Sequence, residues 1–361
     1  MIDFRYHLVS IVAVFLALAI GIVLGSTELQ GAAGAVLRTA NSSLTSQLNA
    51  TRSERDSDAA QASAYAAQVS AGDVFLKTSE SRLLDGGRLL AGNRLVIVTE
   101  PGAPDAVTNG VKTAAADAGA VVTGEVALQS TFNELSGPTG ATLSSINLSV
   151  AASDGTTLAA GTDPQTTYQQ DAAQLIATAI LEKPESQQQN QQGQAGLSAA
   201  SARTLLNAYA QAGFITVNGS PANRAGLVVI IAPGSVPADG ASDPTNQVLV
   251  AIGREFAGSG AVTVIAGATT PSGQAGSAIS VVRASPVARK VSTVDNADRT
   301  QGQITVMQAI AAQVAGGQPS SYGVSGAASV APSPAPTAPQ TPTASTQPAN
   351  AGNGGKKGNN K

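Results

Sequence analysis

The sequence predicts an α/β protein anchored in a membrane, with a single N-terminal transmembrane helix, a long helical stalk, a mostly parallel-sheet α/β domain and a disordered C-terminal tail. Three observations lead to this prediction. Residues 8–25 are apolar and uncharged, residues 90–317 alternate short apolar runs with helix-compatible segments, and prolines recur among Ala, Ser and Thr after residue 331. Each pattern is typical of one part of the predicted architecture.

The composition narrows the chemistry that the chain can carry. Its 361 residues are enough for two domains or for one domain with appendages. It has no cysteine, which excludes disulfides, thiolate metal sites and a cysteine nucleophile. The net charge of −3 lacks the basic surplus of a nucleic-acid-binding protein, so we expect no nucleic-acid partner. The one histidine, His7, precedes the apolar run and cannot serve a catalytic triad on the other side of a membrane.

The apolar run from Leu8 to Gly25 predicts a membrane anchor. As a helix it would be about 27 Å long, enough to cross the hydrocarbon core of a bilayer. It is longer than the apolar region of about 7–15 residues in a cleaved signal peptide. We therefore expect an uncleaved signal-anchor in contact with membrane lipid; a cleaved signal peptide and a buried helix are the alternatives. Because Arg5 precedes the run and Glu28 follows it, the positive-inside tendency places residues 1–7 in the cytoplasm and the rest of the chain outside it.

Residues 26–89 are expected to form a stalk, helical from Ser26 to about Gly72. A heptad frame places Leu37, Leu44, Thr51, Asp58 and Tyr65 at one core position and Asn41, Leu48, Arg55, Ala62 and Val69 at the other. Arg55 and Asp58 interrupt this apolar seam. Two alternatives therefore stay open: a coiled coil with a partner helix or a second copy of the chain, and a lone exposed helix.

The α/β domain is expected from residue 90 to residue 317. Short apolar runs predict strands at 95–98, 120–126, 227–232, 262–266 and 279–283. Helices are expected near 103–119, 168–181 and 197–212, after Asp243, and over a final stripe from Ile304 to Val314. The glutamine-rich stretch 186–194 is interpreted as a surface loop, and residues 318–361 as the disordered tail. Alternating strands and helices predict a mostly parallel sheet that is covered on both faces.

A polar cluster, Ser292–Asp298, precedes the final helix. Asp295 and Asp298 could bind a hard cation or a substrate, but the simpler interpretation is that they cap the helix or shape its loop. Met307 lies on the apolar face of the final helix and is interpreted as a core residue. We assign no catalytic residue, no cofactor-binding residue and no metal ligand, and we expect no enzyme activity.

Three stretches carry a resemblance to a known family. The opening Arg5–Ser26 (RYHLVSIVAVFLALAIGIVLGS), the segment Ala212–Thr216 (AGFIT) and the block from Ser292–Asn296 (STVDN) through Gly302–Val306 (GQITV) to Tyr322-Gly323 occur in order. Together they resemble the actinobacterial MctB family of copper transport proteins over residues 1–323. The glutamine-rich insert and the tail after Gly323 lie outside the resemblance.

The resemblance implies a membrane protein that limits intracellular copper, described as an outer-membrane channel. The residues themselves do not favour a channel, because the expected strands are short, continuously apolar and separated by helices. A family relative, SteB, has a similar layout and is associated with the control of cell-wall hydrolases during division. The resemblance therefore implies a role in copper efflux or homeostasis, with a non-enzymatic envelope scaffold for a division partner as the alternative. No copper ligand is carried over from the family to this sequence.

Overall fold

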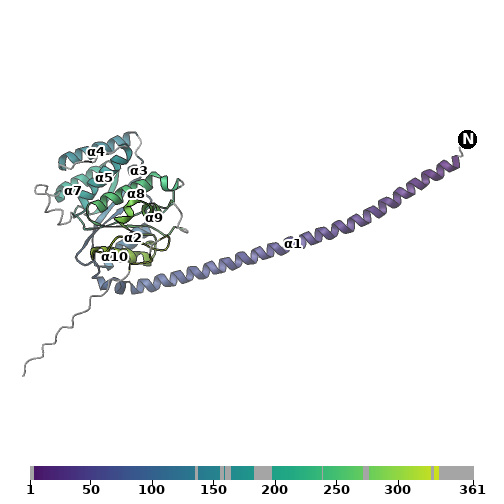
Figure 1. The fold of residues 1–361 in the computed structure, drawn as a ribbon, viewed down its shortest axis with the longest axis horizontal. Helices are drawn as coiled ribbons and strands as arrows, with labels where there is room; N and C mark the ends of the chain where they lie inside the picture. Colours follow the sequence, from purple (N-terminus) through teal and green to yellow (C-terminus); the bar gives the residue numbers. More distant parts are fainter. Residues whose placement is uncertain are drawn as a thin grey trace, which may run out of the picture. The chain divides into compact units, whose positions relative to one another are not determined.

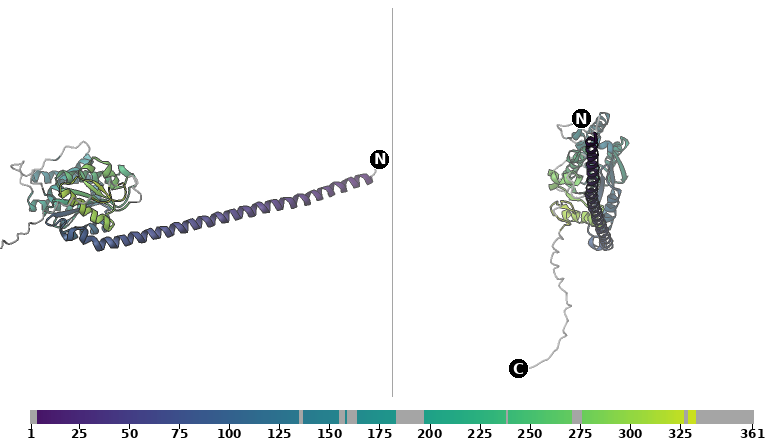
Figure 2. Two further views of the ribbon diagram at one scale, coloured as in Figure 1. Left: turned by 60° about the horizontal axis from the view of Figure 1, so that its bottom comes forward. Right: turned by 90° about the vertical axis from the view of Figure 1, so that its right-hand side faces the viewer.

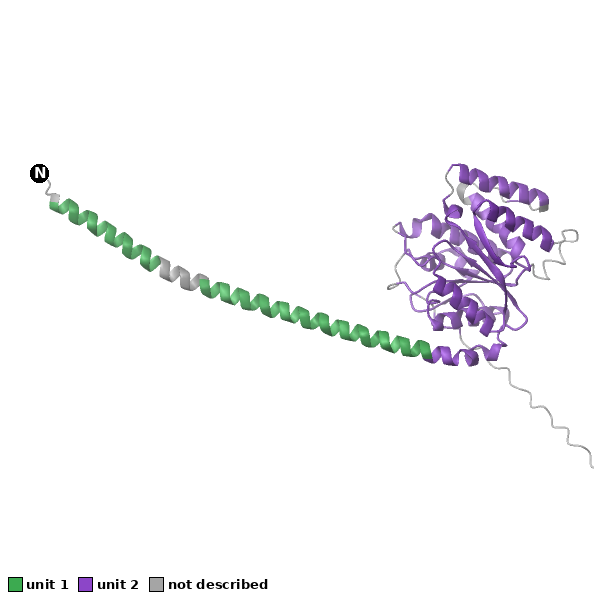
Figure 3. Cartoon of the chain, turned by 180° about the vertical axis from the view of Figure 1, so that it is seen from behind, with its two compact units in different colours: residues 1–74 green, residues 75–361 purple. Residues whose placement is uncertain are grey.

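The computed structural model describes residues 4–134, 137–154, 158, 164–182, 197–237, 239–270, 276–326 and 329–332. It divides into two compact units, residues 1–74 and residues 75–361, which are coloured separately in Figure 3. The predicted glutamine-rich loop at 186–194 lies outside the described residues, as do residues 327–328 and 333–361 of the tail that was predicted over 318–361.

The first unit belongs to one continuous helix, α1 (Phe4–Leu83), of 80 residues (Figure 1). No proline occurs before Pro101, so nothing in this stretch removes a helical hydrogen bond. Within α1 the segment Arg5–Gly25 is long and apolar enough to cross a membrane. The helix therefore continues past Gly72, where the sequence predicted its end, and its last residues belong to the second unit.

The second unit contains a sheet with the strand order β3-β2-β1-β4-β5-β6-β7. The strands are β1 (Arg94–Thr99), β2 (Val121–Leu128), β3 (Ile215–Gly219), β4 (Leu227–Ile231), β5 (Val262–Ala266), β6 (Ser292–Val294) and β7 (Ser321–Tyr322). All neighbouring strands are parallel except β2 and β3, which are antiparallel. The mostly parallel α/β fold that the sequence predicted is thereby confirmed.

Helices cover both faces of the sheet (Figure 1; Figure 2). They are α2 (Asp105–Asp117), α3 (Ser130–Asn133), α4 (Pro138–Asp154), α5 (Pro164–Ile180), α7 (Ala199–Gln211), α8 (Pro244–Gly258), α9 (Ala278–Ala284) and α10 (Thr300–Val314), with short 3₁₀ turns at Asp85–Gly87, Gly240–Ser242 and Pro286–Arg289. Alternate residues of β1 point to opposite faces. Leu95 and Ile97 pack in the core under α2 and α10, whereas Val96 and Val98 pack in the core under α5, α7 and α8.

The helices expected near 103–119, 168–181 and 197–212 are confirmed as α2, α5 and α7, and Met307 is confirmed as a fully buried core residue. The strand expected at 279–283 is wrong, because these residues form α9. Ser277 caps this helix by accepting a hydrogen bond from the Ser280 N–H. Its buried side chains, Ile279 and Val282, are three positions apart, a spacing that suits a helix and not a strand.

Three strands extend the sheet where the sequence predicted none: β3, which pairs antiparallel with β2, and the two short strands β6 and β7. Ser292–Val294 form β6 inside the cluster that was expected to lead into the final helix, and Ser321–Tyr322 form β7, beyond the domain end expected at residue 317. The polar side chains of β6 find partners within the fold. The Ser292 hydroxyl accepts hydrogen bonds from Gln313 Nε2 at 2.9 Å and from the Ser320 N–H at 3.1 Å. Polar residues can therefore fill a buried strand here, which hydropathy alone does not reveal.

Candidate functional site at the carboxyl edge of the sheet

The carboxyl ends of the parallel strands meet at one edge of the sheet. The chain runs from β1 outward to β2 on one side, and later adds β4 on the other side of β1. In open α/β sheets, ligands bind outside the carboxyl ends of the strands where the order reverses in this way. The loops that follow β1 and β4 are therefore the first place to look for a site.

Backbone hydrogen bonds join these two loops. The Glu100 N–H donates to the Ile231 carbonyl at 3.0 Å, and the Gly234 N–H donates to the Gly102 carbonyl at 3.1 Å. The loop after β1 reads Glu-Pro-Gly-Ala-Pro and lacks the glycine-rich pattern that brings a backbone close to a pyrophosphate. A dinucleotide site of that kind is therefore not built here.

Glu100, the first residue after β1, is a carboxyl enclosed by the fold. Its side chain is only 2% exposed, and neither carboxyl oxygen has a hydrogen-bond partner. Burial raises the pKa of Glu100 from 4.5 to about 8, because an apolar environment disfavours the charged form. The group is therefore mainly protonated at neutral pH. Glu100 was not among the candidate residues expected from the sequence, although an acidic residue two positions after the apolar run 95–98 was a visible signal.

A pocket of about 400 Å³ opens between the ends of β1 and β2, and Glu100 is one of the residues that line it. The other polar side chains of its wall are Thr99, Asp105, Thr108, Glu125, Gln129 and Ser130. Glu125 already has a partner, since Lys112 Nζ lies 2.8 Å from its Oε2. The wall thus combines three carboxyls with hydroxyl and amide groups.

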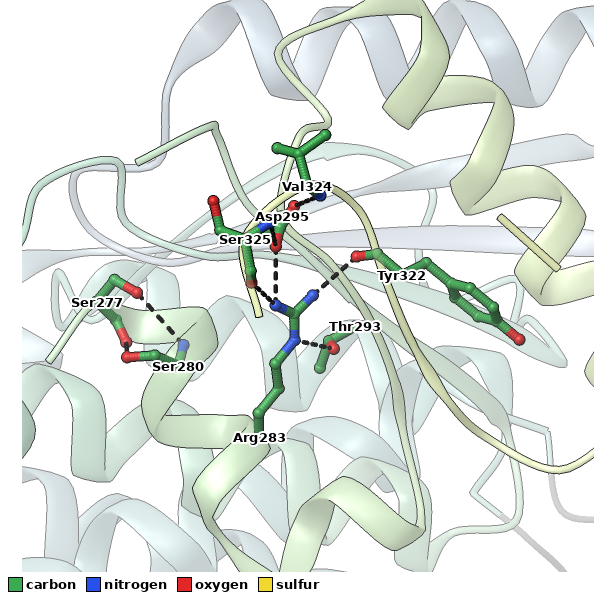
Figure 4. Close-up of polar contacts among 8 residues, drawn as sticks. All are labelled: Ser277, Ser280, Arg283, Thr293, Asp295, Tyr322, Val324 and Ser325. Atoms are coloured by element: carbon green, nitrogen blue, oxygen red, sulfur yellow. Dashed lines mark hydrogen bonds and ion pairs between the residues drawn. The ribbon is translucent and has the colours of Figure 1, made fainter. Parts of the chain in front are cut away.

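At the other end of the same edge, Asp295 belongs to a cluster centred on Arg283 of α9 (Figure 4). Arg283 Nη1 donates to Asp295 Oδ2 at 2.8 Å, Nε donates to Thr293 Oγ1 at 2.9 Å, and Nη2 donates to the Tyr322 carbonyl at 2.8 Å. The Asp295 carboxylate also accepts the N–H groups of Val324 and Ser325, at 2.7 and 2.9 Å. This cluster fastens residues 322–325 to β6, so we call it the C-terminal clamp.

The clamp explains why a glycine follows Tyr322. Gly323 has φ +128°, a conformation that side chains disfavour, and a Cβ placed there would lie 1.9 Å from Asp295 Oδ1. The Tyr322-Gly323 pair quoted in the sequence analysis is therefore set by backbone geometry and by the Asp295 carboxylate.

The contacts of Asp295 and Asp298 also show that the helix cap expected from these two residues is wrong. Asp295 binds residues 324 and 325, and Asp298 Oδ1 accepts the Thr269 N–H at 2.7 Å and the Thr269 hydroxyl at 2.8 Å. The residue that precedes α10 is Arg299, and no side chain caps that helix. Both aspartates therefore shape loops, as the sequence interpretation had offered beside helix capping. The structure does not bring them together with a third ligand, and the described residues contain no group of three or more His, Cys, Asp or Glu that could hold a metal ion.

The fold defines a class of protein: a long helix with one membrane-compatible segment, continuing into a doubly wound α/β unit. Sequence comparison places the chain within that class. It belongs to the family described as "Copper transport outer membrane protein, MctB", which matches residues 1–332. The resemblance stated from the three sequence stretches is thereby confirmed.

Similar proteins occur in mycobacteria. The chain is 30% identical over 330 residues to the "Copper transporter MctB" of Mycobacterium bovis and to that of Mycobacterium tuberculosis, covering 90% of this chain and 96% of each relative. It is 28% identical over 336 residues to the "Copper transporter MctB" of Mycobacterium leprae, with the same coverage. The family match thus extends over the membrane-compatible segment Arg5–Gly25, the rest of α1 and the described part of the α/β unit.

Proposed function

We propose that this chain is a membrane-anchored cell-envelope protein that acts in copper homeostasis and lowers the copper content of the cell. The observation that supports this proposal is the family match over residues 1–332, together with relatives named copper transporters that align over 90% of the chain. The apolar segment Arg5–Gly25 supports the membrane part of the proposal.

We further propose the orientation that the flanking charges favour. The first residues lie in the cytoplasm, Arg5–Gly25 crosses the membrane, and the α/β unit lies outside the cytoplasm. The chain has no cysteine, so a single cysteine introduced at exposed Arg289 reports the side on which the α/β unit lies. A membrane-impermeant maleimide should label Arg289→Cys in intact cells. Labelling only after lysis would contradict this orientation.

In this proposal the α/β unit works by binding and not by catalysis. Two of its polar contacts have structural tasks: Arg283 and Asp295 fasten the C-terminal segment, and Asp298 holds Thr269. The unit therefore serves as a receptor or docking module in the envelope.

Copper content tests the copper role directly. Cells that lack the chain should accumulate more copper than the parent strain when copper is added to the medium. The full chain should restore the parental level, whereas a chain with Leu16→Arg and Ile20→Arg should not, because two charges in the middle of the anchor oppose insertion. Equal copper in deletion and parent cells would remove this proposal.

A second candidate function is a non-enzymatic envelope scaffold that regulates a cell-wall hydrolase or division partner. The observation that favours it is the row of exposed apolar side chains along the described part of α1: Leu37, Leu44, Leu48, Tyr65 and Val69. Such a row is typical of a helix that pairs with another helix. Altered septation with unchanged copper in deletion cells would favour the scaffold, whereas raised copper with normal division would favour the copper role.

A further inference from the structure

The pocket between the ends of β1 and β2 has the features of a small-molecule site. We propose that it binds a small organic cation, a molecule with a primary ammonium or guanidinium group, through the carboxyls of Glu100 and Asp105. This inference is independent of the proposed role in copper homeostasis, because it depends only on the pocket wall.

The charges around the pocket favour a cation. Asp105 lies exposed in the first turn of α2, and Glu125 is neutralised in part by Lys112. The start of α2 has no side-chain cap, and a helix start contributes only about half a unit of positive charge. Each ionised carboxylate contributes a full negative unit. The Asp105 carboxylate alone therefore outweighs the helix start while Glu100 is still protonated, and an anionic ligand would be repelled.

Glu100 lacks the partner that such a ligand would supply. Leaving a buried polar group unsatisfied is costly, and native proteins seldom do so. Both oxygens of Glu100 are enclosed and without a partner, although the residue lines the pocket. In this proposal the Glu100 carboxyl turns from its enclosed position toward the pocket, by rotation about its side-chain torsions, when a ligand binds. An N–H donor with a positive charge would then satisfy the carboxyl and favour its ionised form.

The rest of the wall supplies acceptors. Gln129 Nε2 donates to the Ala127 carbonyl at 3.2 Å and to Thr216 Oγ1 at 3.3 Å, which leaves the amide oxygen to accept. The Thr108 hydroxyl donates to the Pro104 carbonyl at 3.3 Å, so its oxygen retains a lone pair for a ligand. Hydroxyl and amide acceptors suit a ligand that carries several N–H donors.

Size and geometry favour an organic cation over a bare metal ion. A volume of about 400 Å³ lies in the range of pockets that hold small organic ligands. The described residues contain no group of three or more His, Cys, Asp or Glu that could hold a metal ion, so the three carboxyls of the wall do not form such a group. A bare metal ion would leave most of this volume to water.

The test is calorimetric titration of the full chain in detergent micelles at pH 7. The probes are putrescine, agmatine and methylammonium, compared with acetate, inorganic phosphate, Mg²⁺ and Cu²⁺. We expect at least one of the amine or guanidine probes to bind and the anions not to bind. Glu100→Gln should weaken that binding about 10- to 100-fold, since it removes the charge of one acceptor and nearly keeps its shape. Asp105→Asn should also weaken it.

A control variant and a measurement of proton release show whether the probes bind at Glu100. Asp117→Asn removes a carboxyl from the opposite end of the same helix, and it should leave probe affinity unchanged. Binding at pH 7 should release protons into the buffer, seen as a dependence of the heat on buffer ionisation, and Glu100→Gln should abolish this release. Failure of all three amine and guanidine probes, preferential binding of phosphate or a metal ion, or equal affinity in folded Glu100→Gln would overturn the proposal.

Discussion

Glu100 couples the stability of the α/β unit to pH. Its pKa is about 8 in the folded protein and about 4.5 when unfolded, so the folded state keeps a proton that the unfolded chain has released between these pH values. The free energy of unfolding therefore falls as pH rises from 4.5 to 8, and this contribution is constant above that window. One pKa unit corresponds to about 1.4 kcal/mol, so the full loss is on the order of 5 kcal/mol.

Glu100→Gln should remove this pH dependence. We expect the variant to resemble the unchanged chain near pH 4.5 and to be more stable by up to about 4 kcal/mol near pH 8, because no charge has to be buried. Urea unfolding at pH 5, 6.5 and 8 measures the difference. Asp117→Asn, which changes a carboxyl that is 45% exposed, serves as the control. Parallel curves for the unchanged chain and Glu100→Gln across this range would contradict the prediction.

Arg283 of the C-terminal clamp carries a second prediction at the residue scale. Arg283→Met leaves the enclosed Asp295 carboxylate without its cation, which typically costs about 3–5 kcal/mol. Residues 322–325 should exchange their amide hydrogens faster, because the clamp holds them. Hydrogen exchange and urea unfolding measure both effects. Exposed Arg289, on the adjacent 3₁₀ turn, is the matched control, and Arg289→Met should change neither.

Some of these residues were visible in the sequence and some were not. Asp295 and Asp298 stood out as a polar cluster, but their partners lie on segments up to 30 residues away, and no local pattern specifies such contacts. Glu100 could have been found as a carboxyl placed directly after an apolar strand. Arg283 could not have been found in this way. It lay within residues 279–283, which were interpreted as a strand, and the sequence contains no signal for its contacts with Thr293, Asp295 and Tyr322.

At the scale of elements, the sequence predicted helices and strands correctly where the pattern of apolar residues alone determines them. The buried strands β1, β4 and β5 are built on apolar runs, with Thr263 as the one polar residue inside the run of β5, and α2 and α7 have clear apolar stripes. β6 was missed because its hydroxyls are satisfied by partners distant in the chain, and α4 (Pro138–Asp154) because its residues show almost no amphipathic pattern. The coiled-coil prediction for α1 stays a prediction.

The apolar seam of α1 makes that prediction testable. Leu44, Leu48 and Tyr65 are 56–66% exposed, and all three lie on the predicted seam. If two copies pair in parallel, Leu48→Cys should form a disulfide between copies in membranes under mild oxidation. Ser53→Cys, on the opposite side of the heptad, should not. Equal cross-linking at both positions, or none at either, would favour a lone helix; the chain has no other cysteine to confuse the result.

At the scale of the whole molecule, the two hydrophobic cores define what must be present for the α/β unit to fold. They reach from Leu84, which is fully buried, to Tyr322, and partly buried Leu76 packs against one of them. The clamp adds Val324 and Ser325. A fragment of residues 75–332 keeps all of these groups, whereas a fragment of residues 90–317, the domain limits expected from sequence, loses them at both ends.

The two fragments should therefore differ sharply in stability. Loss of a buried leucine costs about 2–5 kcal/mol. The shorter fragment keeps the Arg283–Asp295 ion pair but loses β7 and the two N–H groups that donate to the Asp295 carboxylate, and each such hydrogen bond to a charged group is worth about 1.5–3 kcal/mol. A domain has about 5–15 kcal/mol in total, so residues 90–317 should unfold at low urea or fail to fold. Residues 75–332 should unfold cooperatively, within about 1 kcal/mol of the α/β unit in the full chain. Circular dichroism during urea titration measures both, and equal stability of the two fragments would mean that neither Leu84 nor the clamp supports the sheet.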